Sequence, residues 1–516
     1  MASILKAQLR LFNSLGRQLE AFEPLVAGRA RVYTCGLTVY NYAHIGNLRA
    51  YVFADTLRRA LQCKGFDVLH VINITDVGHL TSDADVGDDK VETAAKKAGR
   101  SVWDITRHYT EDFQQQLRKL QVQEPAVQPK ATEHIQEMIA YARQLEEGGY
   151  VYTLPDGLYF DTSRVPDYGR LALLDLAGLD EGRRVDTQGK RNPSDFAVWR
   201  CSPKDKQRLM EWDSPWGMGA PGWHLECSVM SMKYLGERFD IHTGGIDHRQ
   251  VHHCNEIAQN QGYLRGGDGG IRYWLHNEFL LLENMKMSKS SGDFIRLQTL
   301  EEWGLHPLVY RYFLLMTHYR SQVEFSAEGL RAAKAGFSRL IRRIQVLRER
   351  AGTPAWWHVF EDARYTRGGS FEYAISVLSS GFDAAAHAVL TRFDEAMSAD
   401  LNSAQLLAVL SQTVQESNLD PDVVLRLVAI GELALGLRLL DLKPEELNLR
   451  PASAALSDAD IDNLIAERQR AREARDFKRA DAIRAELGAA GVELQDNRDG
   501  RPTEWEWLPA IPRGGS

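Results

Sequence analysis

The feature that most constrains the fold of this chain is a succession of strand, helix and strand near its start. Arg31 to Gly36 ends in glycine and has the composition of a short strand. Tyr42 to Leu61 carries apolar residues at helical spacing, and Val68 to Ile74 is a buried, strand-like run. This succession predicts a βαβ unit and a parallel sheet, whose ligands bind at the carboxyl ends of the strands. His44 to Asn47 would then lie beside the ligand crevice.

The rest of the chain changes character twice. Strand-like runs return at Phe239 to His242 and Glu278 to Leu282, after a mixed stretch, which predicts one nucleotide-binding sheet split by an insertion. From Pro307 onward the pattern is helical. The long periodic stretches are 308–318, 327–350, 403–417 and 423–440.

Two segments in the second half stand apart from these helices. Gly352 to Gly369 contains Pro354, two tryptophans and a Gly-Gly pair, and we expect an irregular connector there. Ser457 and Asp460 form a potential capping box at the start of a last, arginine-rich module.

Composition excludes several classes of protein. The 516 residues carry 62 Lys and Arg against 70 Asp and Glu, a net charge of −8, which argues against indiscriminate coating of nucleic acid. Met1 to Phe12 lacks a signal-peptide pattern, and we find no run of about 18 apolar residues, so we expect a cytoplasmic protein without membrane contact. Five scattered cysteines favour free thiols or metal ligands over disulfides.

Two short motifs point to phosphate chemistry. In His44-Ile45-Gly46-Asn47 a glycine would let phosphate approach the backbone, and helix N-terminal amides favour an anion. Alone, this motif is equally consistent with an ordinary strand-to-helix turn. Lys286-Met287-Ser288-Lys289-Ser290 places two lysines in a loop that could close on a polyphosphate, for which a solvated basic loop is the alternative.

Together these motifs resemble the signatures of class I aminoacyl-tRNA synthetases, and the surrounding sequence is similar to the cysteinyl-tRNA synthetase family. The matching stretches are Tyr33–Tyr40, Asn73–Asp76, Pro129–Ile135, Arg191–Trp199, Pro221–Ser228, Asp240–Gly245 and His252–Gln259. The resemblance implies an α/β fold with a Rossmann-type catalytic domain that contains a connective insertion. An α-helical bundle and a small carboxyl-terminal module follow.

The resemblance also implies boundaries for these parts. The first half of the catalytic domain would span 1–110, the connective insertion 111–220, the second half 221–285, the KMSKS loop and stem-contact region 286–325, the tRNA-binding helical bundle 326–452 and the anticodon-binding module 453–516.

Four residues have side chains suited to Zn²⁺: Cys35, Cys227, His252 and Glu256. His252 and Glu256 are four residues apart and share a helix face. From the residues alone, buried thiols remain the alternative for the cysteines. The resemblance implies that all four are ligands of one zinc ion per chain. Because packing separates near-isosteres by only about 1–3 kcal/mol, zinc would select the thiol of cysteine over the hydroxyl of serine by its softness.

Cys254 departs from the family, which commonly has a glutamate there. It lies two residues from His252, so on a helix it points to the other side, and we expect it to be a bystander rather than a ligand.

The resemblance implies further site residues. Catalytic roles fall to His44, Asn47, Lys286 and Lys289; ATP binding to His44, Gly46, Asn47, Gly244, Asp247 and Lys289; and the substrate pocket to Thr38, Asp76 and Trp223. Asn47 replaces the usual histidine of this motif. An amide can still donate a hydrogen bond, so we expect activity to persist.

Contacts with tRNA are expected in the second half of the chain. Arg339, Arg342, Arg343 and Arg348 are candidate phosphate contacts, as are the arginines between Arg468 and Arg484. Trp505 and Trp507 could stack on unpaired anticodon bases. Without the family, a solvated, salt-bridged helix face is the alternative for these arginines.

The expected reaction is activation of L-cysteine by ATP with Mg²⁺, followed by transfer of the cysteinyl group to tRNA(Cys) by a monomeric enzyme. One alternative is a ligase that joins cysteine to an amino-sugar acceptor. That family resembles a version without the anticodon-binding end, whereas this chain retains about 200 residues after the KMSKS loop. A non-catalytic tRNA-binding paralogue is the other, although the motif lysines and candidate ligands are intact.

Overall fold

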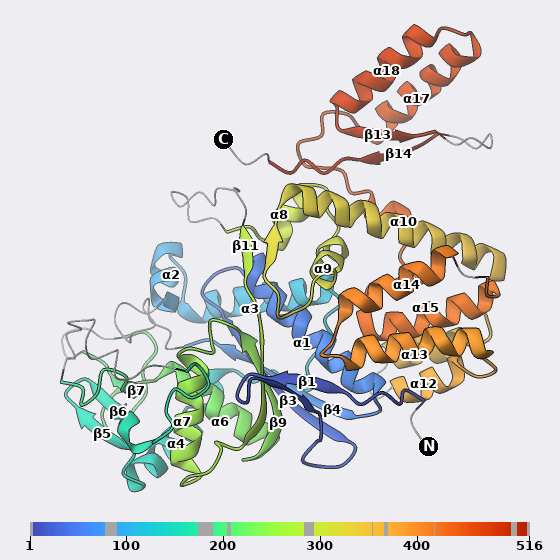
Figure 1. Ribbon diagram of the computed structural model, residues 1–516. Helices are drawn as coiled ribbons and strands as arrows, with labels where there is room; N and C mark the ends of the chain where they lie inside the picture. Colours follow the sequence, from blue (N-terminus) through green and yellow to red (C-terminus); the bar gives the residue numbers. More distant parts are fainter. Residues whose placement is uncertain are drawn as a thin grey trace.

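A four-stranded parallel sheet forms the centre of the amino-terminal half. The computed structural model (Figure 1) describes residues 4–77, 90–173, 189–203, 208–282, 294–352, 354–365, 370–416, 418–496 and 503–512. The strands are β3 (Arg29–Thr38), β4 (Asp67–Thr75), β9 (Phe239–Gly245) and β10 (Ile271–Asn277), in the order β10-β9-β3-β4. Strand β3 pairs with β4 and with β9, so segments about 200 residues apart in sequence become neighbours.

The predicted βαβ unit is present, as β3, α1 (Ile45–Cys63) and β4. The prediction for Glu278 to Leu282 is wrong in its placement. The strand there, β11 (Leu280–Leu282), pairs with β12 (Val323–Phe325) outside the central sheet, and β10 takes the fourth position instead. Strand β10 contains arginine, histidine and asparagine, so it lacks the apolar run that marks a buried strand in sequence.

An inserted segment lies between β4 and β9 in the sequence. It contains α3 (Val102–Lys119), α4 (Ile135–Glu147) and a second sheet, antiparallel, of β5 (Val151–Leu154), β6 (Gly157–Phe160), β7 (Phe196–Cys201) and β8 (Gly219–Pro221). After β8 the chain forms α6 (Trp223–Leu235), which packs on β3 and β4. Helix α7 (His252–Tyr263) follows β9 and contacts α6.

The remaining shorter elements complete the amino-terminal half. They are β1 (Arg10–Asn13), β2 (Gln18–Ala21), α2 (Lys90–Ala98), η1 (Ala131–His134), η2 (Thr162–Arg164) and α8 (Leu297–Glu302).

The second half of the body is helical, as the sequence predicts. Its helices are α9 (Pro307–Leu315), α10 (Ala327–Ala351), α11 (Trp357–Tyr365), α12 (Phe371–Leu378), α13 (Ala384–Ser398), α14 (Ser403–Glu416), α15 (Pro421–Leu435) and α16 (Pro444–Leu447). The expected irregular connector at Gly352 to Gly369 is wrong in part, because α11 lies within it. Trp356 and Phe360 are buried there, so tertiary packing stabilises a helix in a stretch whose ends carry turn residues.

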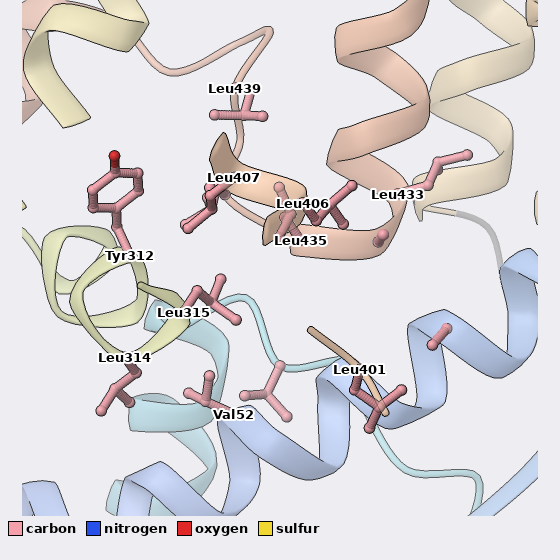
Figure 2. Packing of buried hydrophobic residues seen from close by; sticks show 14 of the residues in the cluster. Val52, Tyr312, Leu314, Leu315, Leu401, Leu406, Leu407, Leu433, Leu435 and Leu439 are labelled. Atoms are coloured by element: carbon pink, nitrogen blue, oxygen red, sulfur yellow. The ribbon is translucent and has the colours of Figure 1, made fainter. Parts of the chain in front are cut away.

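One hydrophobic core joins the sheet to the helical region. Figure 2 shows Val52 of α1 beside Leu314 and Leu315 of α9, with Leu407 and Leu435 of the bundle above them. Burial of such side chains contributes about 1.5–3 kcal/mol each, so the bundle is held firmly against α1.

The carboxyl-terminal module stands outside this body (Figure 1) and has its own small core. It consists of α17 (Asp458–Glu473), α18 (Phe477–Ala489), β13 (Val492–Gln495) and β14 (Glu504–Trp507). The predicted capping box is confirmed: Ser457 Oγ accepts from the Asp460 amide, and the Asp460 side chain accepts from the Ser457 amide. Among the described residues, no helix has the length and apolar character needed to cross a membrane.

Candidate active site

Four buried donor groups meet at the carboxyl end of the central sheet. Cys35 lies on β3, Cys227 on α6, and both His252 and Glu256 on α7. Their donor atoms all lie within 4.8 Å of one another. The two sulfur atoms are 3.9 Å apart, and His252 Nε2 is 3.1 Å from Glu256 Oε1. The structure therefore brings together the four predicted ligands from positions more than 200 residues apart in the sequence.

These distances fit a tetrahedral metal ion. Two thiolates bound to Zn²⁺ at about 2.3 Å would stand roughly 3.8 Å apart, close to the observed sulfur separation. A disulfide requires an S–S length of about 2.05 Å, and all five cysteines are free. The donor set of two thiols, one imidazole and one carboxylate is also typical of zinc.

A second donor set overlaps the first. Cys35 and Glu256 also lie within 4.8 Å of His242 on β9 and His253 on α7. His253 Nε2 is 3.4 Å from Cys35 Sγ, and His242 Nε2 is 2.9 Å from Glu256 Oε2. Sequence reasoning missed both histidines. Both left a signal in the sequence, since His242 ends a strand-like run and His253 adjoins a candidate ligand. Pairing of β9 with β3 brings His242 to the site, and His253 arrives with His252 and Glu256 on α7.

Further side chains orient one histidine of each donor set. His252 Nδ1 lies 2.9 Å from His224 Nδ1, so its Nε2 is the nitrogen that faces Glu256. His253 Nδ1 contacts His276 Nε2 at 2.8 Å, and His276 Nδ1 lies 2.8 Å from Ser14 Oγ. Such outer contacts hold metal ligands in place.

Cys254 lies outside both donor sets. Its thiol donates to the Arg249 carbonyl at 3.2 Å and packs beside Leu171 and Ile257. Burial raises the pKa of this thiol to about 11, so it stays protonated at neutral pH. This placement agrees with the expectation that Cys254 is a bystander.

Burial determines the protonation of the cluster. Desolvation raises the pKa of the Cys35 thiol well above its ordinary value, and the neighbouring Cys227 thiol and Glu256 add to the rise. A bound cation would offset this penalty and favour thiolates.

Trp223 forms one wall of the cluster. Its ring lies 4.3 Å from the His252 ring and 5.2 Å from that of His224, centroid to centroid. Trp223 is half-buried at the first turn of α6, so its ring packs against the ligand side and is also partly open to solvent.

His44 and Asn47 cap the start of α1 reciprocally. His44 Nδ1 accepts from the Asn47 amide, and Asn47 Oδ1 accepts from the His44 amide, both at 3.1 Å. The carboxamide oxygen of Asn47 therefore serves the helix cap. Burial lowers the pKa of His44, although Asp247 opposes the shift, so its imidazole is mainly neutral at pH 7.

Gly244 and Asp247 complete the crevice beside His44. Asp247 is exposed, and its Oδ2 lies 4.0 Å from His248 Nε2; its negative charge raises the pKa of both His44 and Cys35. A Cβ on Gly244 would lie 2.6 Å from the His253 ring, so only glycine fits there.

The other predicted pocket residues have different surroundings. Thr38 ends β3 beside Thr75. Asp76 follows β4, and its two carboxylate oxygens accept from Thr132 N at 2.9 Å and Thr132 Oγ1 at 2.7 Å. In this structure Asp76 therefore ties the sheet to η1 of the insertion. Lys286 and Lys289 lie outside the described residues.

The arginines predicted to contact tRNA lie on α10 and in the carboxyl-terminal module. Arg342 pairs with Glu506, and Arg348 donates to the Leu440 carbonyl and covers Trp357, so both serve internal contacts. Arg339 and Arg343 are exposed on α10. In the carboxyl-terminal module Arg468, Arg472 and Arg484 gather around Asp496.

One tryptophan of that module is buried and the other is half-buried. Trp507 is 1% exposed in the module's core, and Trp505 Nε1 donates to Asp462. The exposed aromatic ring is Phe477, 62% exposed at the first turn of α18. Its signal in the sequence was an aromatic residue among arginines and lysine.

Comparisons with known proteins agree with this geometry. The model of the class I (C) tRNA synthetase catalytic domain matches residues 21–335, and that of the cysteinyl-tRNA ligase anticodon binding domain matches 456–502. Cysteine--tRNA ligase of Zymomonas mobilis is 49% identical over 514 residues, covering 98% of each chain. The enzyme of the same name from Novosphingobium aromaticivorans is 50% identical, covering 97% of each.

Among solved structures, methionyl-tRNA synthetase of Mycobacterium tuberculosis, bound to methionyl-adenylate, aligns with a TM-score of 0.50 at 16% identity. The alignment covers 79% of this chain and 89% of that one, and it supports the shared fold.

Proposed function

The chain belongs to the cysteinyl-tRNA synthetase (cysteine-tRNA ligase) family of class I synthetases, and on that premise we propose that it charges tRNA(Cys) with L-cysteine. The cysteine carboxylate attacks the α-phosphorus of ATP and releases diphosphate. The terminal adenosine of the tRNA then attacks the acyl carbon of cysteinyl-adenylate and releases AMP.

The buried Cys35, Cys227, His252 and Glu256 cluster is the observation that carries this proposal. These residues would hold one Zn²⁺. Zinc, when bound, supplies a soft Lewis acid that prefers sulfur to oxygen, and this preference favours cysteine over serine. Trp223 packs against the His252 ring on one side of the cluster.

The start of α1 supports the nucleotide role. The positive end of this helix and the neutral His44 side chain that caps it favour a bound anion, although the Ile45 amide already donates to the Ile295 carbonyl and the Asn47 amide to His44 Nδ1. We assign phosphate contacts to His44, Gly46 and Asn47, and contacts with the rest of the nucleotide to Gly244 and Asp247. Lys286 and Lys289 would stabilise charge on the diphosphate that leaves, and Mg²⁺ enters with ATP.

We keep the expected domain boundaries as proposals, with one reservation at 110/111, which falls within α3. The end of the antiparallel sheet at Pro221 supports the boundary expected after residue 220, and the start of α17 at Asp458 supports the start of the last module expected at 453. In that module Phe477 replaces the two tryptophans as our candidate for stacking on an anticodon base. Thr38 and Asp76 remain candidates for the amino-acid pocket, although both carboxylate oxygens of Asp76 already accept hydrogen bonds from Thr132.

Charging of total tRNA with labelled cysteine, and in parallel with labelled serine, tests the proposal. The full-length protein with ATP and Mg²⁺ should give acid-precipitable cysteine and no serine. The metal content, measured by plasma mass spectrometry, should be one zinc per chain.

The amino-sugar ligase alternative makes a different prediction. Cysteine-dependent exchange of diphosphate into ATP without any charging of tRNA would indicate that other acceptor. Loss of both reactions would favour a binding paralogue and would contradict our proposal.

A further inference from the structure

The carboxyl-terminal module is held to the body by contacts beyond its chain connection. The clearest lies on α10, where the Lys334 side chain is buried at 4% exposure. Its Nζ donates to the Trp507 carbonyl at 2.6 Å and to the Gly304 carbonyl at 3.5 Å. One ammonium group thus joins β14 of the module to the turn before α9.

Burial of this lysine has a cost. Desolvation, with help from nearby Arg342, lowers the pKa of Lys334 to about 8. A leucine or methionine would fill the same space without that penalty. The hydrogen bond to Trp507 is what the charged side chain adds.

Trp507 connects the two bodies through its backbone. Its indole ring fills the module's core, while its amide donates to Asn448 Oδ1 at 2.7 Å. Asn448 Nδ2 in turn donates to the Trp505 carbonyl at 3.3 Å. Strand β14 is therefore held from the segment after α16 as well as from α10.

The chain after β14 returns to the body. The Ala510 amide donates to the Trp303 carbonyl at 2.9 Å, and Ile511 is 4% exposed within the main hydrophobic core. Arg342 of α10 pairs with Glu506 and donates to Gln495. The contacts made by residues 505–511 lie beyond Pro502, where the anticodon-domain match ends.

We propose that Lys334 is a positioning residue, which fixes the anticodon-binding module at one orientation to the catalytic site by holding β14. Ile511 supplies a second anchor for the same purpose. This inference rests on the proposed tRNA-charging function. Figure 1 shows α17 and α18 standing apart from the body. A tRNA that binds both parts depends on their relative orientation.

The expected consequence is on affinity for tRNA. If only a fraction of molecules holds the module correctly, the apparent dissociation constant rises by the inverse of that fraction. If loss of this contact left roughly one tenth of the molecules with the module correctly oriented, the tRNA KM would rise about tenfold. Turnover of bound tRNA and activation of cysteine, which need only the body, should keep their rates.

Lys334→Met tests this, because methionine keeps the stem but cannot donate. Arg331→Met, which removes an exposed charge from the same helix, is the matched control, and Lys334→Arg restores a charged donor. Ile511→Asp disrupts the second anchor independently. For each full-length variant we would measure hydrogen exchange of residues 505–511, cysteine-dependent diphosphate exchange, and kcat and KM for tRNA charging.

The expected result for Lys334→Met and Ile511→Asp is faster hydrogen exchange in 505–511 with α17 and α18 still protected, a tRNA KM about tenfold higher, and unchanged diphosphate exchange. Arg331→Met and Lys334→Arg should resemble the parent. Faster exchange without a change in KM, or a fall in kcat at constant KM, would overturn the positioning role. Failure of the parent to charge any tRNA would instead reject the proposed function, because the hydrogen-exchange result does not depend on activity.

Discussion

A buried charged triad shows how single residues hold the catalytic and helical regions together. Asp55 of α1 accepts from Arg59 at 2.7 Å and also pairs with fully buried Arg311 of α9. Burial alone would raise the pKa of Asp55, but the two guanidinium groups outweigh it and lower the pKa to about 2. Ionised Asp55 therefore stabilises the fold above its unfolded pKa near 4, by about 2 kcal/mol, and this contribution is lost as the pH falls from about 4 to 2.

Asp55→Asn should lower the free energy of unfolding at pH 7 by about 3–5 kcal/mol, because it leaves two buried guanidinium groups without their carboxylate. The deficit, measured by urea unfolding, should shrink as the pH approaches 2. The control is Asp67→Asn, which breaks an exposed pair with Arg29 and should cost less than about 1 kcal/mol. A deficit independent of pH would contradict the electrostatic explanation.

The departure at Cys254 gives a second prediction at this scale. Cys254→Ser should leave the zinc content at one per chain, since the thiol faces the Arg249 carbonyl and not the cluster. Glu256→Gln removes a direct ligand shared by both donor sets, so it should lower the zinc affinity by more than the roughly 10- to 100-fold that loss of an outer contact costs. Competition with a chromophoric chelator measures both, and zinc loss only in the Cys254 variant would refute our ligand assignment.

At the scale of elements, the site depends on how closely β3 and β4 approach. Gly36 follows Cys35, and a Cβ there would overlap the Asn73 carbonyl oxygen. Gly36→Ala should therefore push the two strands apart, displace Cys35 and reduce bound zinc to well below one per chain. Gly488→Ala on α18, where a Cβ has open space, is the control and should retain full zinc. Normal zinc content in Gly36→Ala would show that the strands tolerate the change.

At the scale of the whole molecule, amino-acid activation and tRNA recognition lie in different parts. Phe477→Ala removes the exposed ring from the module without touching the cluster, so diphosphate exchange should stay normal. Stacking on one base contributes about 1–3 kcal/mol, so the tRNA KM should rise roughly 5- to 150-fold. Trp505→Phe, which loses the bond to Asp462 but keeps a ring, is the comparison. An unchanged KM in Phe477→Ala would place anticodon recognition elsewhere.

Much of the architecture could be predicted from the sequence because its signals are local. The βαβ unit, the helical second half and the capping box at Ser457 each rest on patterns within about 20 residues, and the structure confirms them. The resemblance carried by the motifs is confirmed by the comparisons. The side-chain types at Cys35, Cys227, His252 and Glu256 also predicted a metal site, although the family was needed to group them.

Only the tertiary structure decided the features that depend on distant contacts. Strand β10 joined the sheet by pairing with β9, and α11 formed where packing outweighed turn residues. His242 reached the cluster because β9 lies beside β3, and His253 because α7 packs against that site. The Trp507 ring packs in the core of the carboxyl-terminal module. Contacts with α10 and the body hold β14 and the tail that follows it. Local sequence patterns carry propensity, whereas burial and partners depend on which segments meet in space.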